Sequence, residues 1–134
     1  LEALAKPNIT FMGYVPDEDL PDLLARCKAF VFPGREDFGS APLEAQAAGR
    51  PVIAYGAGGA LDSIVDGETG TFFREATAES LEQAVRAFDV DHIDPQVCRA
   101  NAERFSVHRF QQELSAALTR VLKSPNDRAD SLMR

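Results

Sequence analysis

Short apolar runs alternate with segments of helical periodicity along most of the chain. Each run is too short for a helix and ends near glycine or proline, which is typical of a buried β-strand. Four strands are predicted in this way, over residues 9–15, 29–32, 51–55 and 70–73. Strands that alternate with helices indicate an α/β fold with a parallel sheet.

Apolar residues at helical spacing predict the helices between and after these strands. Leu20, Leu23, Leu24 and Cys27 form one apolar helical face, and Pro42 is suited to the first turn of the next helix. Shorter helical signals cover 60–65, and a helical C-terminal third follows, whose helices begin after the caps Thr77, Asp94 and Ser106. We therefore divide the chain into one domain, residues 1–123, and a polar tail, residues 124–134.

Composition and charge exclude several classes of protein. The 134 residues carry 14 Lys and Arg against 21 Asp and Glu, a net charge of −7, so we expect no nucleic-acid partner. The densest apolar runs are four residues long, which predicts no transmembrane segment. The only cysteines, Cys27 and Cys98, are far apart and suggest neither a disulfide framework nor a zinc site. We expect a cytoplasmic protein that binds no metal.

The loop after the second predicted strand carries the most informative pattern. Glu36 lies beside the strand end, Glu44 lies in the first turn of the following helix, and Gly39 and Ser40 stand between them. Unpaired amides at a helix start can face an anion, and carboxylates can accept hydrogen bonds from paired hydroxyls. This arrangement suits a ligand with sugar hydroxyls and phosphates. On spacing alone, the favoured interpretation is that both acids are ordinary loop and helix-dipole charges.

The sequence of residues 36–54 resembles the Glu-x7-Glu signature of retaining glycosyltransferases, specifically glycosyltransferase family 4. The resemblance continues through Gly58-Gly59, Asp66-Gly67 and Thr69-Gly70, and it covers roughly residues 8–115. It implies the GT-B fold, in which two Rossmann-like domains face a cleft. This chain resembles the C-terminal, donor-binding domain, with wording most similar to bacterial mannosyltransferases of surface polysaccharide synthesis.

The resemblance also implies a role for each residue of the signature. Glu44 would hold the ribose hydroxyls of the nucleotide, and Glu36, the predicted catalytic residue, would hold hydroxyls of the donor sugar. The segment Phe38-Gly39-Ser40-Ala41 would offer backbone amides to the sugar and diphosphate. Val15 would lie against the nucleotide base. Ser40 replaces the aliphatic residue that is most frequent at this position of the family. The resemblance also implies a mechanism that needs neither a cofactor nor a metal.

Family members build this domain from six strands, and the first two precede anything that resembles residues 9–15. The family strand order, 3-2-1-4-5-6, would leave residues 9–15 at the far edge of the sheet. We expect them either to pair with a segment outside this sequence or to form an edge that is exposed or covered by an oligomer partner. The basic pair that neutralises the diphosphate and the acceptor domain are also not represented here, and Arg35 and Arg50 are the basic residues near the signature. We therefore expect the 134-residue chain alone to be inactive.

These observations predict part of a glycosyltransferase that moves a hexose onto a glycan or lipid-linked acceptor, with GDP-mannose as the first expected donor. The full-length protein could then sit at the inner membrane as a peripheral protein. One alternative is a non-catalytic module of the same fold that binds a nucleotide or a protein partner. A second is a GT-B sugar-nucleotide epimerase or phosphorylase, against which the Glu-x7-Glu spacing speaks.

Overall fold

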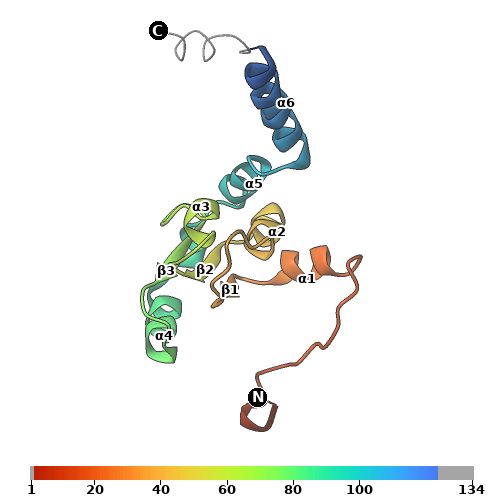
Figure 1. Cartoon of the computed structure of the whole chain (residues 1–134). Coiled ribbons are helices and arrows are strands. Elements are labelled where there is room, and N and C mark those ends of the chain that lie inside the picture. The colour runs from red at the N-terminus through yellow and green to blue at the C-terminus, as the bar shows by residue number, and fades with distance from the viewer. Residues whose placement is uncertain (1, 124–134) are drawn as a thin grey trace.

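The computed structural model describes residues 2–123 and contains a parallel sheet covered by helices (Figure 1). The three strands are β1 (Phe30–Phe32), β2 (Val52–Tyr55) and β3 (Gly70–Phe73). The α-helices are α1 (Leu20–Arg26), α2 (Ala41–Ala47), α3 (Ala60–Ser63), α4 (Ala78–Ala87), α5 (Pro95–Glu103) and α6 (Val107–Lys123). Two 3-10 turns, η1 (Glu2–Leu4) and η2 (Val90–His92), complete the described elements. The predicted tail, 124–134, lies outside the described residues.

The sheet has the order β1-β2-β3, and both strand pairs are parallel. The register aligns Phe30 with Val52 and Val52 with Gly70. Helix α2 packs on β1 and β2, and α1, α3 and α5 pack against α2. Helix α4 contacts β2 and β3 and lies on the opposite side of the sheet in Figure 1. The predicted α/β class with a parallel Rossmann-like sheet is confirmed.

The strand that we predicted over residues 9–15 is not formed, and that prediction was wrong for the described chain. The segment runs outside the sheet between η1 and α1 (Figure 1), and Ile9, Phe11, Met12 and Tyr14 are all exposed. A strand needs a neighbour for its backbone N–H and C=O groups. No strand of the described residues 2–123 pairs with this segment, so its apolar pattern alone does not produce one.

The predicted caps explain where the later helices begin. Thr77 Oγ1 accepts a hydrogen bond from the Ser80 amide at 3.2 Å, at the start of α4. Asp94 Oδ1 accepts from the Gln96 amide at 2.8 Å before α5. Ser106 Oγ accepts from the Arg109 amide at 3.3 Å before α6. Each oxygen satisfies an amide that has no partner within its helix, so these sequence signals were sufficient.

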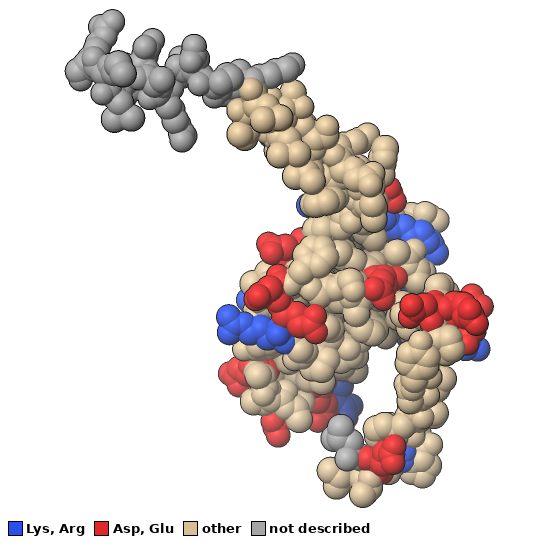
Figure 2. All heavy atoms as spheres, turned by 45° about the vertical axis from the view of Figure 1, so that its right-hand side comes forward, with Lys and Arg blue, Asp and Glu red and all other residues tan. Residues whose placement is uncertain are grey.

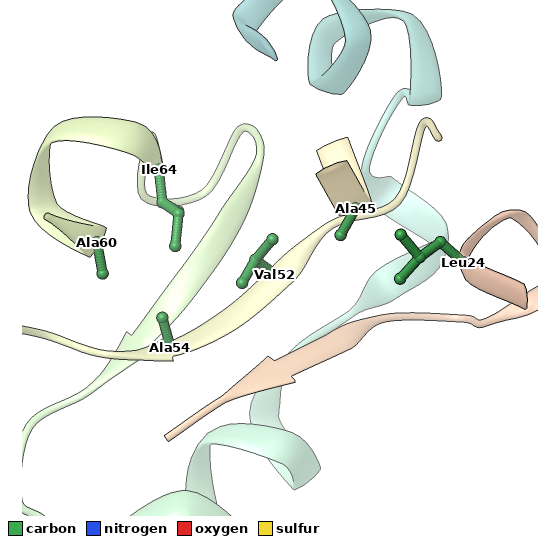
Figure 3. Close-up of a cluster of buried hydrophobic side chains, with 6 residues drawn as sticks. All are labelled: Leu24, Ala45, Val52, Ala54, Ala60 and Ile64. Carbon is green, nitrogen blue, oxygen red and sulfur yellow. The ribbon is translucent and has the colours of Figure 1, made fainter. Parts of the chain in front are cut away.

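A cluster of small and branched side chains between the sheet and its helices forms the core (Figure 3). Val52 and Ala54 of β2 lie at its centre, with Ala45 of α2 above them. Leu24, Ala60 and Ile64 close the cluster from α1 and the region of α3. The alanines allow α2 and α3 to lie close to the sheet. This close packing fixes the loops that lead into both helices.

Helix α6 projects from the rest of the protein (Figure 1) and carries apolar side chains on its surface. Phe110, Leu114 and Leu118 are at least 45% exposed. The face of this helix seen in Figure 2 is almost free of charged side chains, whereas acidic side chains are spread over the sheet-containing part. No helix of residues 2–123 is both long enough and apolar enough to cross a membrane.

Candidate functional site

Two loops meet at the carboxyl ends of β1 and β2. The amide of Gly59, in the loop after β2, donates a hydrogen bond to the carbonyl oxygen of Glu36 at 2.8 Å. A Cβ atom on Gly59 would lie 2.5 Å from the carbonyl oxygen of Asp37, and one on Gly58 would also overlap the backbone of Glu36. The glycine pair is therefore required for this approach of the two backbones. Ligands of open α/β sheets bind at this edge.

The carboxylate of Glu36 lies over the bend of its own loop. A Cβ atom at Gly39 would stand 3.5 Å from Glu36 Oε2, and one at Gly34 would stand 4.0 Å from Glu36 Oε1. Gly39 has a φ angle of +71°, which favours glycine over other residues. A Cβ atom at Gly39 would also stand 3.3 Å from the tip of the Phe32 ring. The structure thus brings the Glu36 carboxylate close to Gly39.

Helix α2 begins with amide groups that no side chain caps. Ser40 is the N-cap residue, and its side chain accepts no capping hydrogen bond. Its carbonyl oxygen accepts from the amides of Leu43 at 2.9 Å and Glu44 at 3.0 Å. The amides of Gly39, Ser40 and Ala41 donate to no acceptor within residues 2–123. Donors of this kind at a helix start are suited to an anion.

Glu44 lies on the exposed side of α2 and lines two surface grooves. The first, of about 750 Å³, lies between α1 and α2 and includes Leu20 and Leu24. The second, of about 510 Å³, lies between α2 and the end of α5, and Phe38 and Ser40 line it together with Glu44. The structure therefore brings three residues of the signature to one groove.

Val15 lies in a separate hollow of about 670 Å³ on the other side of α1. Met12 and Tyr14 share that hollow with it, and Asp22 and Ala25 line both this hollow and the α1–α2 groove. Helix α1 thus stands between Val15 and Glu44. The donor-binding role of Val15, like the roles of Glu36, Glu44 and the intervening amides, stays a prediction.

Arg99 is a residue near the signature that sequence reasoning missed. It lines both grooves that contain Glu44, and its Nη2 lies 3.5 Å from the carbonyl oxygen of Ala48. Arg50, by contrast, uses its guanidinium to donate to the Ala25 carbonyl. Only an indirect feature of the sequence points to Arg99. Cys98 and Asn101 form the buried face of α5, and Arg99 follows Cys98 directly, so it lies beside the contact between α2 and α5.

The fold changes the ionisation of two thiols. Burial raises the pKa of the Cys98 thiol, Asp94 raises it further, and Arg99 partly offsets this. Burial also raises the pKa of Cys27, against the effect of Arg50. Neither thiol forms a disulfide. Residues 2–123 contain no group of three or more His, Cys, Asp or Glu side chains placed to hold a metal ion.

Comparison with known proteins agrees with this fold. The family model described as "Glycosyl transferases group 1" matches residues 1–105. The chain belongs to this family. The resemblance to the C-terminal domain of a GT-B glycosyltransferase is thereby confirmed, and the finer assignment to family 4 stays a prediction.

Relatives of this group 1 glycosyltransferase chain include several enzymes that are named as mannosyltransferases. It is 30% identical to the alpha-1,3/1,6-mannosyltransferase ALG2 of Dictyostelium discoideum over 85% of the chain and 28% of that protein. It is 38% identical to the lipopolysaccharide core biosynthesis mannosyltransferase LpcC of Rhizobium leguminosarum over 63% of the chain and 24% of that protein. The chain therefore spans about a quarter of the length of these relatives.

A solved structure has the same fold. The Anabaena protein Alr3699/HepE, crystallised in complex with UDP and glucose, superposes with a TM-score of 0.67 at 26% identity. The match covers 85% of this chain and 32% of that one. The two chains therefore share a fold over most of the length of this one.

Proposed function

We propose that this chain is the donor-binding part of a retaining glycosyltransferase that moves a hexose from a nucleotide sugar to a hydroxyl of a glycan or lipid-linked acceptor. The observation that carries the proposal is the loop between β1 and α2. It combines the Glu36 carboxylate, the Glu44 carboxylate and free amides at the start of α2, at the edge of the sheet where ligands bind.

Each part of this loop has a chemical task in the proposed reaction. The amides of Gly39, Ser40 and Ala41 would face the diphosphate and stabilise the negative charge that grows as it departs. Glu44 would accept hydrogen bonds from the ribose hydroxyls, and Glu36 from hydroxyls of the transferred sugar. Val15 would lie against the base. No cofactor or metal has a role in this scheme.

GDP-mannose is the donor that we propose first, because relatives as different as ALG2 and LpcC are named as mannosyltransferases. UDP-glucose is the competing donor, because Alr3699/HepE was crystallised with UDP and glucose. We also propose that the protein works in the cytoplasm, where free thiols such as Cys27 and Cys98 persist. A peripheral position at the inner membrane would suit a lipid-linked acceptor.

The experiment is a thermal-shift panel of UDP, GDP, ADP and their sugars on the full-length protein, followed by product analysis. We expect GDP and GDP-mannose to raise the melting temperature most, and a glycoside to form from the sugar donor. A larger shift with UDP would change the donor but not the reaction. Nucleotide binding without a glycoside product would favour the non-catalytic alternative, and no shift with any nucleotide would refute the proposal.

A further inference from the structure

Buried side-chain amides join α2, the end of α3 and α5. Gln46 is fully buried, and Asn101 is 6% exposed. Gln46 Nε2 donates to the Ser63 carbonyl at 2.9 Å and to the Pro42 carbonyl at 3.2 Å. Asn101 Nδ2 donates to Gln46 Oε1 at 2.6 Å and to the Ser63 carbonyl at 2.8 Å. These bonds fix the position of α5 against α2 because buried polar groups must keep their partners.

The network continues from Asn101 to the surface of the site. Arg104 Nη1 donates to Asn101 Oδ1 at 2.7 Å, and the Arg104 guanidinium lies over the Phe105 ring, 5.5 Å from its centre. The Phe105 ring meets the Phe38 ring edge-on, with 6.3 Å between the centres and 61° between the planes. Edge-to-face contacts of this kind are favourable. Buried Gln46 is thus connected to Phe38 by a continuous path.

Phe38 needs support of this kind because its surroundings are open. Its side chain is 58% exposed, and the next residue, Gly39, has the backbone freedom of a glycine at φ +71°. The hydrogen bond from Gly59 to Glu36 holds the loop on one side. The Phe105 ring contacts Phe38 in the same loop. A loop that is ordered before its ligand arrives loses less entropy on binding.

We propose that Phe105 is a positioning residue: held by Arg104 and Asn101, its ring fixes Phe38 and thereby the free amides at the start of α2. This rests on the proposed function, in which those amides receive the donor diphosphate. Phe105 itself touches no reacting atom in this scheme. Its effect is on the affinity for the diphosphate, through the order of the loop.

The test is a double-mutant cycle in the full-length protein with Phe38→Ala, Phe105→Ala and the double variant. Calorimetry gives the Kd of whichever of UDP, GDP and ADP binds the wild type most tightly. We expect each single variant to raise Kd about two- to tenfold, since the ring pair is lost in either one. The Kd of the double variant should be no higher than that of the single variant that binds the nucleotide less tightly. Losses that multiply would overturn the proposal.

A second measurement does not need the nucleotide. In hydrogen exchange of the free protein, the amides of Leu43, Glu44 and Gly59 report on the loop, because they donate to its carbonyl groups. We expect Phe105→Ala to accelerate their exchange and Phe105→Tyr to restore the wild-type rates. Unchanged exchange in Phe105→Ala would overturn the inference. Exchange that accelerates as expected in a protein that binds no nucleotide would support it while refuting the proposed function.

A matched control separates positioning from a general loss of stability. Phe88 is a half-buried phenylalanine that lines a hollow between β3 and α4, on the other side of the sheet. Phe88→Ala removes the same ring without touching the loop. It should lower the melting temperature while leaving the Kd and the three amides unchanged. If Phe88→Ala weakens nucleotide binding as much as Phe105→Ala does, the positioning role is wrong.

Discussion

The carbonyl oxygen of Glu36 accepts a hydrogen bond from the amide of Gly59 at 2.8 Å, which joins the loops after β1 and β2. The first residue of the signature is therefore anchored by its backbone, while its side chain stays exposed and free to meet a ligand. This contact exists only because Gly58 and Gly59 have no side chains. The glycine pair is thus as much part of the candidate site as the carboxylates.

Replacement of Gly59 should disturb the site more than its position outside the signature suggests. In Gly59→Ala, the new Cβ would overlap the backbone of Asp37 and Phe38, so the loop must move. Overpacking of this kind costs about 1–3 kcal/mol of the free energy of unfolding. We expect nucleotide affinity to fall about tenfold or more as well, measured by calorimetry beside chemical denaturation.

The control for this variant is Gly67→Ala. Gly67 has a φ angle of +79°, but a Cβ there would meet no atom within 4 Å. Its replacement costs about 1–2 kcal/mol through backbone strain alone, so stability falls while nucleotide affinity stays constant. Equal losses of affinity in both variants would show that Gly59 acts only through global stability.

Glu44→Ala should weaken the binding of the nucleoside diphosphate about ten- to a hundredfold. The physical reason is that hydrogen bonds to a charged group contribute about 1.5–3 kcal/mol, and about 1.4 kcal/mol corresponds to a factor of ten. The matched control is Glu79→Ala, which removes an acidic residue from the first turn of α4. Calorimetry on both variants separates a ribose contact from a helix-dipole effect. If the two variants change the affinity for the diphosphate equally and only slightly, Glu44 interacts with the helix dipole and does not contact the ribose.

Glu36→Ala should behave differently, because its proposed contacts are on the transferred sugar. Contacts that strengthen as the glycosidic bond breaks lower kcat when they are removed, whereas uniform contacts raise KM. We expect unchanged affinity for the bare diphosphate and a loss of turnover with the sugar donor. Calorimetry of the diphosphate and steady-state kinetics of the donor measure the two effects. If diphosphate affinity falls as far as in Glu44→Ala, the division between the two carboxylates is wrong.

Local signals in the sequence were sufficient for three of the four predicted strands and for the helix starts. Thr77, Asp94 and Ser106 act through bonds to amides two or three residues ahead, which spacing alone reveals. The segment around Phe11 has the apolar pattern of a strand, but a strand also needs a neighbour, and pairing is not visible in a local pattern. That difference explains the one wrong element.

The residues of the candidate site also separate into those that a local sequence pattern predicts and those that it does not. Glu36 and Glu44 lie within one loop and helix start, so the sequence alone assigns both to the segment between β1 and α2. Arg99 and Phe105 reach the groove only because α5 packs on α2, more than 50 residues along the chain from Glu44. That packing includes the hydrogen bond between Asn101 and Gln46, two residues that no motif singles out. Tertiary contacts of polar side chains are what the sequence reading could not supply.

Asn101→Ala should lower the free energy of unfolding by about 1–3 kcal/mol, because it leaves the buried oxygen of Gln46 without its donor. Chemical denaturation measures the effect, with the exposed Asn8→Ala as control. The double variant with Gln46→Met and Asn101→Leu removes both polar partners and should recover part of the loss. The single variants Gln46→Met and Asn101→Leu are measured as well. If their losses of unfolding free energy add fully in the double variant, a direct interaction between these side chains is contradicted.

Cys98 should be protected from alkylation in the folded protein and should make stability fall at alkaline pH. The side chain is fully buried, and this burial raises the pKa of its thiol above the ordinary value of 9.0. Because thiolate is the reactive form, iodoacetamide at pH 7.5 should label Cys98 only after unfolding, and the half-buried Cys27 sooner.

The raised pKa of Cys98 also makes the free energy of unfolding depend on pH, because the unfolded thiol ionises at a lower pH than the folded one. The stability that Cys98 contributes is present below the unfolded pKa and is lost as the pH rises through the folded pKa. Denaturation of wild type and Cys98→Ala between pH 7 and pH 10 isolates it, since the variant should lose less stability over that range. Equal slopes, or native labelling of Cys98 as fast as a free thiol, would contradict the prediction.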